Sequence, residues 1–283
     1  MKIGAVMFFT VDAMQPAPLA RALEERGFES LWVPEHTHIP SGGKSVYPAS
    51  GGLVQAYYEL MDPFLALNTA AAVTTTLKVG TGIALIPQRD PIVTAKMVST
   101  IDQLSGGRFL FGVGNGWNQE EVENHGTPFA SRHKLARERI EAMKAIWGQD
   151  EPEYRGEFVR FDRMKQWPKP LQKPHPPIIV GGAFPYAARR AVRYGDGWIP
   201  RDDWLDRDGI GVLDAFRKMA IEAGRDPAGL PITTFRVPPD IERLRRYREL
   251  GIDRVVFSLP AEREDRILPI LDRWASLKRQ LDG

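Results

Sequence analysis

Two imidazoles and a carboxylate follow one short apolar segment of this sequence. Residues 30–33 are typical of a buried strand, and Glu35, His36 and His38 come directly after them. Such side chains can transfer protons, contact a cofactor or bind a metal. We expect a catalytic or cofactor-contacting role for His36. One alternative is that His36 and His38 are ordinary polar loop residues. The other is that both rings hold a metal, since residues two apart on a strand point to the same side.

A metal site would need more ligands than these two histidines. His125, His133 and His175 are the other histidines of the chain, and none of them clearly ends an apolar segment. The chain contains no cysteine, which excludes disulfides, thiolate nucleophiles and thiolate ligands. We therefore predict no metal site.

Glycines occur inside two further apolar segments. Gly80 and Gly82 interrupt the first, and glycines alternate with other residues from Gly112 to Gly116 in the second. Glycine weakens a strand, so it usually marks a bulge or a close approach of the backbone to a ligand. For the first segment, the alternative is that small residues simply ease packing inside a barrel. The second segment is similar to a dinucleotide-binding loop but lacks the complete G-x-G-x-x-G spacing.

A glycine pair also follows a later apolar segment. Gly181, Gly182 and Ala183 come just before a predicted helix, so their backbone N–H groups can face an anion. Arg201, after the next apolar segment, adds a cation nearby. An ordinary turn is the alternative interpretation, and we favour a phosphate site.

Short apolar segments alternate with longer amphipathic ones, and this alternation positions the residues above. The predicted strands are residues 3–8, 30–33, 77–85, 109–113, 177–180, 197–199, 232–236 and 254–258. The predicted helices are residues 16–26, 62–75, 91–104, 186–194, 213–223, 241–250 and 267–281, with others between the fourth strand and residue 147. Eight strands, each followed by a helix, predict an α/β fold, a (β/α)8 TIM barrel, in which the carboxyl ends of all strands meet at one face. A doubly wound open sheet is the alternative.

The chain length suits one barrel. It has 283 residues, and no composition break divides it, so we predict a single domain over residues 1–283. Two insertions, residues 39–60 and 150–176, interrupt the alternation. We place them after strands two and four, where they would roof the site. Tyr57, Trp117 and Trp167 are then expected to line the pocket.

Charge and hydropathy argue against two kinds of partner. The formal net charge is only +2. The densest basic cluster, residues 243–248, alternates with Leu244 and Tyr247 at helical spacing, which indicates a solvated helix face rather than a nucleic-acid patch. No apolar run approaches the roughly 20 residues that span a bilayer. The chain begins directly with a predicted strand, so we expect a cytoplasmic protein with neither nucleic-acid nor membrane partners.

The segment ends taken together resemble the luciferase-like monooxygenase family. The matching phrases are Trp32-Val33-Pro34-Glu35-His36, Leu77-Lys78-Val79-Gly80-Thr81-Gly82-Ile83, Leu104-Ser105-Gly106-Gly107-Arg108-Phe109, Gly112-Val113-Gly114-Asn115-Gly116-Trp117, Pro177-Ile178-Ile179-Val180-Gly181-Gly182 and Tyr194-Gly195-Asp196-Gly197-Trp198. Each phrase is modest alone, but their order is specific. The similarity is collinear from residue 1 to about residue 200, and beyond that it rests mainly on residues 251–255.

This resemblance implies a bacterial-luciferase-like barrel that binds FMN or its deazaflavin relative, coenzyme F420. It implies a cis peptide at Gly82–Ile83 on a bulge behind the cofactor ring, with His36 beside the ring. It also implies that backbone groups from Gly181 to Ala183 hold the cofactor phosphate. The expected cofactor-binding residues are Gly80, Thr81, Gly82, Ile83, Gly114, Asn115, Gly116, Trp117, Gly181, Gly182, Ala183 and Arg201.

The two cofactors imply different reactions. Coenzyme F420 has carbon at ring position 5, so it carries hydride and reacts poorly with O2, whereas FMN can activate O2. The short chain and the Glu35-His36 phrase make the sequence similar to the coenzyme F420 branch. Trp117 stands where sugar-phosphate dehydrogenases of that branch carry Glu, and Glu35 replaces a common Asp, so a sugar phosphate is not the expected substrate.

We therefore expect hydride transfer between coenzyme F420 and an unidentified small organic substrate. His36 would donate or accept the proton, and Glu35 would orient it. The alternative within the family is an FMN-dependent monooxygenase supplied by a separate cofactor reductase. Outside it, the alternatives are a cofactor-binding protein without catalysis and a metal-dependent hydrolase that uses both strand-end histidines. Homodimers are usual in the family, although no stretch of this sequence specifies an interface.

Overall fold

Eight parallel strands form a nearly closed barrel. The structure, a computed structural model, describes residues 1–42, 44–45 and 53–282. The strands are β1 (Lys2–Val6), β2 (Ser30–Val33), β3 (Lys78–Thr81), β5 (Phe109–Gly114), β8 (Ile178–Gly181), β9 (Gly197–Ile199), β10 (Thr233–Phe235) and β11 (Arg254–Ser258). They follow the order β10-β11-β1-β2-β3-β5-β8-β9, and the bridges Trp198–Ile232 and Arg201–Phe235 join the two ends. The predicted (β/α)8 barrel is confirmed.

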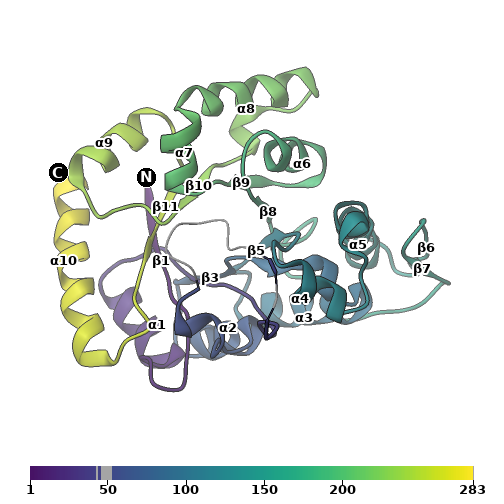
Figure 1. Cartoon of the computed structure of the whole chain (residues 1–283), viewed down its shortest axis with the longest axis horizontal. Helices are drawn as coiled ribbons and strands as arrows, with labels where there is room; N and C mark the ends of the chain where they lie inside the picture. The colour runs from purple at the N-terminus through teal and green to yellow at the C-terminus, as the bar shows by residue number, and fades with distance from the viewer. Residues whose placement is uncertain (43, 46–52, 283) are drawn as a thin grey trace.

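Helices connect successive strands and lie outside the barrel (Figure 1). They are α1 (Pro16–Glu25), α2 (Pro63–Ala72), α3 (Pro91–Leu104), α4 (Gln119–Asn124), α5 (Arg132–Gly148), α6 (Tyr186–Tyr194), α7 (Asp202–Asp208), α8 (Gly211–Glu222), α9 (Ile241–Glu249) and α10 (Glu264–Asp282). α2 and α3 begin alike, because Asp62 and Asp90 each accept two backbone N–H groups of the first turn and precede a proline. α9 is amphipathic as predicted, with Leu244 and Tyr247 buried. Within the described ranges, no helix combines the length and the apolar character that a membrane span requires.

The inside of the barrel is filled by its own hydrophobic cluster, separate from the larger core beneath the helices. Its members are Val6, Trp32, Leu110, Ile179, Ile199, Phe235 and Val256, and Ile83 packs against them. Side chains alternate between the two faces of a strand, so these residues point inward. The cluster is therefore the floor beneath any site at the carboxyl ends of the strands.

Several strand glycines make room for these inward side chains. A Cβ atom added to Gly80 would lie 2.7 Å from Cε3 of Trp32. One added to Gly114 would lie 1.8 Å from Cδ1 of Ile83. Protein side chains thus fill the space beside both glycines, which supports the packing interpretation of the strand glycines over the ligand interpretation.

Replacing Gly112 with alanine is expected to destabilise the fold by at least about 2 kcal/mol, because the new methyl group overpacks the barrel. Its Cβ would lie 1.9 Å from the backbone oxygen of Thr81, whose Oγ1 already donates to the Gly112 oxygen at 2.7 Å. Gly148 at the end of α5 is the matched control, since no atom lies within 4 Å of a Cβ there. Urea unfolding would measure both variants, and equal midpoints would contradict the packing argument.

The first insertion follows β2, as predicted. Part of it lies outside the described residues, and the rest includes a 3-10 helix, Gln55–Tyr57. This segment leaves the carboxyl end of a barrel strand, which is the end where catalytic groups of such barrels gather.

The second insertion does not roof this end. It follows α5 rather than a strand, and it contains the hairpin of β6 (Tyr154–Arg155) and β7 (Arg160–Phe161). Figure 1 shows the hairpin at the end of the molecule opposite α10. A segment that leads from a helix into the next strand must reach the amino-terminal side of the barrel.

Trp167 accordingly lies outside the site, and its predicted place in the pocket is wrong. Its side chain is 59% exposed, and its backbone oxygen accepts from Nζ of Lys96 in α3. Gln166 donates to the Ile92 oxygen at 3.0 Å, and Gln103 donates to the Lys169 oxygen at 2.9 Å. These bonds fix the segment against the outer side of α3.

Candidate active site

His36, at the carboxyl end of β2, contacts a buried carboxylate of α4. Its Nδ1 lies 2.7 Å from Oε2 of Glu121, and the two side chains are 7% and 1% exposed. The backbone N–H of Thr37 donates to the other carboxylate oxygen at 3.1 Å. A carboxylate only accepts, so a neutral His36 carries its proton on Nδ1. Nε2 has no hydrogen-bond partner among the described residues, and its lone pair is available to take a proton.

Glu121 was not predicted from the sequence. It lies in the first turn of α4, where Asn118 is the N-cap and its side chain accepts the Glu121 N–H at 3.1 Å. An N-cap residue followed by an acid three positions later is a recognisable helix start. The sequence signal that could have identified Glu121 is its position shortly after the glycines that end β5.

Glu35 does not orient His36, contrary to the expectation. It is 3% exposed, and its oxygens accept from the Leu85 N–H at 2.6 Å and from Nε of Arg89 at 2.7 Å. The Arg89 guanidinium also lies 3.2 Å from Asp62. Burial alone would lower the pKa of Arg89, but the hydrogen bond and the charge of Glu35 outweigh it, so the pKa is raised. Glu35 therefore fastens β4 (Ala84–Leu85) and the start of α2 beneath the site.

Two aromatic rings lie beside His36. The ring of Trp117 is 5.7 Å from the imidazole, and that of Tyr57 is 5.4 Å away. Phe8, which follows β1, packs 4.7 Å from Tyr57 on its other side. Trp117 and Tyr57, two of the three aromatic residues expected to line the pocket, thus lie beside His36, on segments that follow β5 and β2.

The expected cis peptide between Gly82 and Ile83 is present. It lies between β3 and β4, where the Gly82 N–H donates to the Val33 oxygen at 2.7 Å. Thr81, which precedes it, is fully buried. The bond therefore stands directly over the inner cluster, at the same end of the barrel as His36.

The loop after β8 differs from a simple cradle of free N–H groups. Gly182 has a φ of 134°, and its N–H donates to the Ile199 oxygen at 3.1 Å, so this donor is already used in the sheet. Within the described chain, the N–H groups of Ala183 and Phe184 make no backbone hydrogen bond. Arg190 of α6 reaches the same place, since a Cβ on Gly182 would lie 3.5 Å from its Nη2.

A cationic cluster adjoins this loop, and the sequence did not indicate it. Nε of Arg132 and Nε of Arg190 are buried and have no partner among the described residues. His133 lies between these charges and the end of β5, with Nδ1 2.6 Å from Nδ2 of Asn115. Burial, together with the charges of Arg132 and Arg190, lowers the pKa of His133 to about 4. An anion here would satisfy buried donors that the protein leaves unpaired.

Arg201 is less available to bind a phosphate than expected. It follows β9, and its Nε and Nη2 donate to the two carboxylate oxygens of Asp203 at 2.8 and 2.6 Å. This two-point pairing neutralises most of its charge. The cation beside Gly182 is therefore Arg190, from one turn into α6.

The sequence matches a known family over most of its length. The family profile of luciferase-like monooxygenases matches residues 7–239. This chain belongs to the luciferase-like monooxygenase family. An uncharacterized protein of Mycobacterium tuberculosis is 39% identical over 287 aligned positions, which cover 98% of each chain. The protein is thus an oxidoreductase of the luciferase-like type.

Relatives of two kinds occur in the family. An FMNH2-dependent dimethylsulfone monooxygenase of Pseudomonas putida is 40% identical over 178 residues, which are 62% of this chain and 48% of the relative. A coenzyme F420-dependent hydroxymycolic acid dehydrogenase of Mycobacterium tuberculosis is 28% identical over 216 residues, 75% of this chain and 55% of the relative. Family members therefore use either cofactor.

Solved structures support the luciferase-like fold. A monooxygenase of Streptomyces bottropensis superposes with a TM-score of 0.79 at 20% identity over 100% of both chains. A coenzyme F420-dependent secondary alcohol dehydrogenase superposes with a TM-score of 0.75 at 18% identity over 99% of both chains.

His38 does not join His36 in this luciferase-like barrel. Its Nε2 lies 2.9 Å from Nδ2 of Asn124, and its ring lies 5.6 Å from that of His125. Thr37 bridges the two, with Oγ1 3.0 Å from His38 and 2.7 Å from His125. His36 and His38, the two histidines of the alternative metal site, thus contact different partners. The described residues contain no group of three His, Asp or Glu side chains that could hold a metal.

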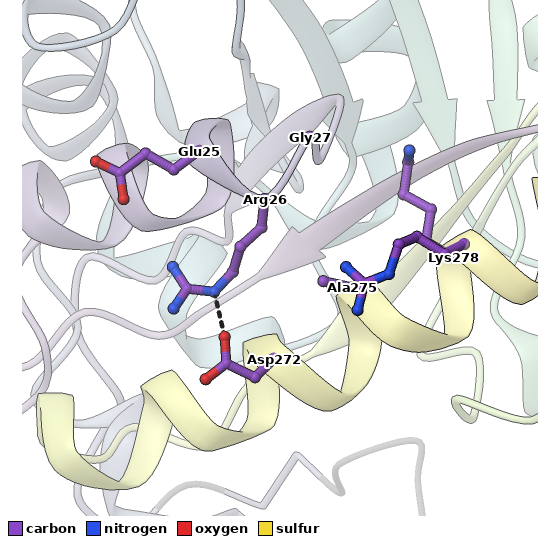
Figure 2. A pocket seen from close by; sticks show the side chains of 7 residues that line it. Glu25, Arg26, Gly27, Asp272, Ala275 and Lys278 are labelled. Carbon is purple, nitrogen blue, oxygen red and sulfur yellow. Dashed lines mark hydrogen bonds and ion pairs between the residues drawn. The ribbon is translucent and has the colours of Figure 1, made fainter.

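A surface pocket of about 620 Å³ lies between α1 and α10, away from this site (Figure 2). It is lined by Glu25, Arg26, Gly27, Asp272, Ala275, Lys278 and Arg279. Arg26 points across it and donates to Asp272 at 2.8 Å (Figure 2). The pocket lies where α1 leads into β2, which is the amino-terminal side of the barrel, so it takes no part in the chemistry at the carboxyl ends.

Proposed function

We propose that this protein transfers a hydride between coenzyme F420 and a small organic substrate, with His36 moving the accompanying proton. The observation that best supports this proposal is the buried pair of His36 and Glu121 at the carboxyl end of β2, in which Nδ1 and Oε2 are 2.7 Å apart. When bound, coenzyme F420 accepts or supplies a hydride through its ring. Conversion between an alcohol and a carbonyl compound also moves one proton, and a neutral imidazole with a bare Nε2 is suited to take it.

Glu121 supports the proton transfer from the far side of the imidazole. As His36 Nε2 takes the hydroxyl proton of an alcohol, the ring becomes positively charged. The carboxylate 2.7 Å from Nδ1 stabilises that charge and fixes the orientation of the ring. In the reverse direction the same Nε2–H donates its proton to the oxygen of a carbonyl compound. Tyr57 and Trp117, beside the ring, limit the access of water.

The residues at the β8 end fit the phosphate that both family cofactors carry. Two buried guanidinium nitrogens without partners, on Arg132 and Arg190, are donors for an anion. The N–H groups of Ala183 and Phe184 lie just before α6, where a helix start attracts negative charge. These residues would hold the phosphate, and the backbone at Gly82–Ile83 would support the ring of the cofactor.

The second candidate is an FMN-dependent monooxygenase that receives reduced FMN from a separate reductase. The identity of 40% with the dimethylsulfone monooxygenase favours it. Fluorescence titration of the full chain with coenzyme F420 and with FMN, side by side, distinguishes the two. Tight binding of coenzyme F420 and weak binding of FMN are expected. The opposite order would replace the proposal by the monooxygenase, and binding of neither would refute both.

Cofactor binding is also expected to change the titration of His133. Its pKa, about 4 in the free protein, should rise toward the ordinary value of 6.5 when a phosphate binds, because negative charge favours the imidazolium. Arg190→Met should raise the same pKa by removing a cation, and it should weaken cofactor binding about tenfold or more. NMR titration of the histidine rings measures both effects.

Arg193→Met, in the last turn of the same helix, is the control. It should leave both the cofactor affinity and the His133 titration unchanged. A His133 pKa that stays near 4 with the cofactor bound would place the phosphate elsewhere.

A further inference from the structure

The side chain of Ile83 fits between two glycines at the mouth of the barrel. A Cβ atom added to Gly114, at the end of β5, would lie 1.8 Å from Cδ1 of Ile83. One added to Gly181, at the end of β8, would lie 3.0 Å from its Cγ2. Ile83 packs on the inner cluster and remains partly exposed. Packing therefore fixes this side chain laterally, while part of its surface stays open.

The carboxyl end of β2 holds the backbone on both sides of Ile83. The Val33 oxygen accepts the N–H of Gly82, just before Ile83, at 2.7 Å. The Glu35 carboxylate accepts the N–H of Leu85, two residues after Ile83, at 2.6 Å. Two acceptors from one strand end thus bracket the short segment that carries Ile83.

Glu35 is itself held in place by a cation. It is 3% exposed, and its Oε1 accepts from Nε of Arg89 at 2.7 Å. Arg89 is anchored in turn, because it lies 3.2 Å from Asp62, the N-cap of α2, and 4.5 Å from the centre of the Phe64 ring. The carboxylate therefore cannot turn away from Leu85 without leaving buried charges unpaired.

Such a buried ion pair adds little stability. An apolar pair of similar volume is often at least as stable, because the removal of two charges from water costs about as much as their attraction gains. The ion pair differs from an apolar pair in that it supplies an oriented acceptor. Here this acceptor fixes the Leu85 backbone, and through it the height of Ile83 above the inner cluster.

We infer that Glu35 is a positioning residue, which sets the height of Ile83 beneath the cofactor ring through its hydrogen bond to the Leu85 N–H. The inference rests on the proposed function for the place of the ring, but not on which of the two cofactors binds. An apolar side chain beneath a flat ring limits how deeply the ring enters the barrel. The orientation of the ring relative to Nε2 of His36 depends on this depth. Glu35 thus acts on the reaction without touching the reacting atoms.

Two double variants separate this role from general support of the fold. Glu35→Gln with Arg89→Met, the Gln variant, removes both charges but keeps an amide oxygen that can accept from Leu85. Glu35→Leu with Arg89→Met, the Leu variant, removes both charges and this acceptor. Because the change at Arg89 is common to both, the difference between them reports the bond to Leu85.

The Cδ1 methyl signal of Ile83 in NMR spectra of the full chain is the readout. Ile199 is the reference, because it packs beside Gly112 and so lies deeper in the barrel. Adding coenzyme F420, or FMN if only FMN binds, should shift the Ile83 signal of the unaltered protein, since an aromatic ring above a methyl group changes its resonance frequency. The Gln variant should keep this shift and bind the cofactor within about threefold of the unaltered protein. The Leu variant should show a much smaller shift and bind about tenfold more weakly.

A single variant guards against a folding defect of the double variants. Glu35→Asp keeps the negative charge for Arg89 but shortens the side chain by one methylene, so it should fold and yet lose the bond to Leu85. Its Ile83 shift is expected to fall between those of the Gln and Leu variants.

The control is the ion pair at the other end of β2. Glu29, just before this strand, accepts from Nε and Nη2 of Arg254 at 2.7 Å each, and Arg254 is 4% exposed. Glu29→Gln with Arg254→Met should lower the midpoint of urea unfolding but leave the Ile83 shift and the cofactor affinity unchanged. Equal shifts in the Gln and Leu variants would overturn the inference, as would a loss of the shift in this control.

The same measurements keep the inference apart from the proposed function. Cofactor binding that leaves the Ile83 signal of the unaltered protein in place would put the ring elsewhere and refute the role of Glu35. A shift caused by FMN alone refutes only hydride transfer with coenzyme F420. Binding of neither cofactor refutes both proposals.

Discussion

Replacing His36 with alanine is expected to lower turnover by about 100- to 10,000-fold, which is the usual contribution of a proton-transferring side chain. The loss of stability should be far smaller, about 1–3 kcal/mol, because Glu121 loses one partner but keeps the Thr37 N–H. Turnover is measured with whichever hydroxy or carbonyl compound the unaltered protein converts fastest. Urea unfolding supplies the free energy of unfolding.

His38→Ala is the matched control for this variant. His38 is an imidazole two residues further along, with Asn124 and Thr37 as its partners. Its loss should change turnover by less than about threefold, because none of these contacts reaches Nε2 of His36. Similar losses of turnover in the two variants, or a loss in His36→Ala that matches its loss of stability, would remove His36 from the mechanism.

Replacing Glu121 with alanine should cost about 10- to 100-fold in turnover, the usual effect of removing the partner that orients a reacting histidine. The carboxylate is fully buried and accepts from both His36 and Thr37, so the free energy of unfolding should fall by about 1–3 kcal/mol as well. Glu121→Gln keeps an oxygen acceptor and should recover part of both losses.

The tautomer of His36 distinguishes a positioning role of Glu121 from a merely structural one, because a loss of structural support alone would not change it. In the unaltered protein, nitrogen NMR should find the proton of the neutral ring on Nδ1, opposite Glu121. In Glu121→Ala the proton should redistribute toward Nε2. Glu123→Gln, an exposed change on the same helix, should leave tautomer, turnover and stability unchanged. An unchanged tautomer in Glu121→Ala would mean that this carboxylate does not position the ring.

Local patterns made most of the fold predictable. Apolar runs of strand length, aspartates before prolines at helix starts and glycines after helix ends depend on neighbours within a few residues. Asp62 caps α2, and Gly27 follows α1 with a φ of 72°. The face of the candidate site followed as well, because all parallel strands of a barrel end at the same side. His36 and Trp117 lie there for that reason, whereas the cis Gly82–Ile83 bond was expected from the resemblance to the family.

The partners of these residues were not predictable in the same way. Glu35 is adjacent to His36 in sequence, yet successive residues point in different directions, and Glu35 binds Arg89, 54 positions away. The carboxylate that reaches His36 is Glu121, 85 positions away. Such pairings depend on the paths of loops, which no periodicity encodes.

The sequence by itself therefore determined the barrel, its family and the end of the barrel at which the candidate site lies. Only the tertiary structure decided which charges meet there. Arg190 rather than Arg201 lies beside Gly182, because Asp203 holds Arg201 while α6 turns Arg190 inward. The physical reason is that strands and helices form through contacts between near neighbours, whereas an active site is made of side chains from different strand ends that only the closure of the barrel brings together.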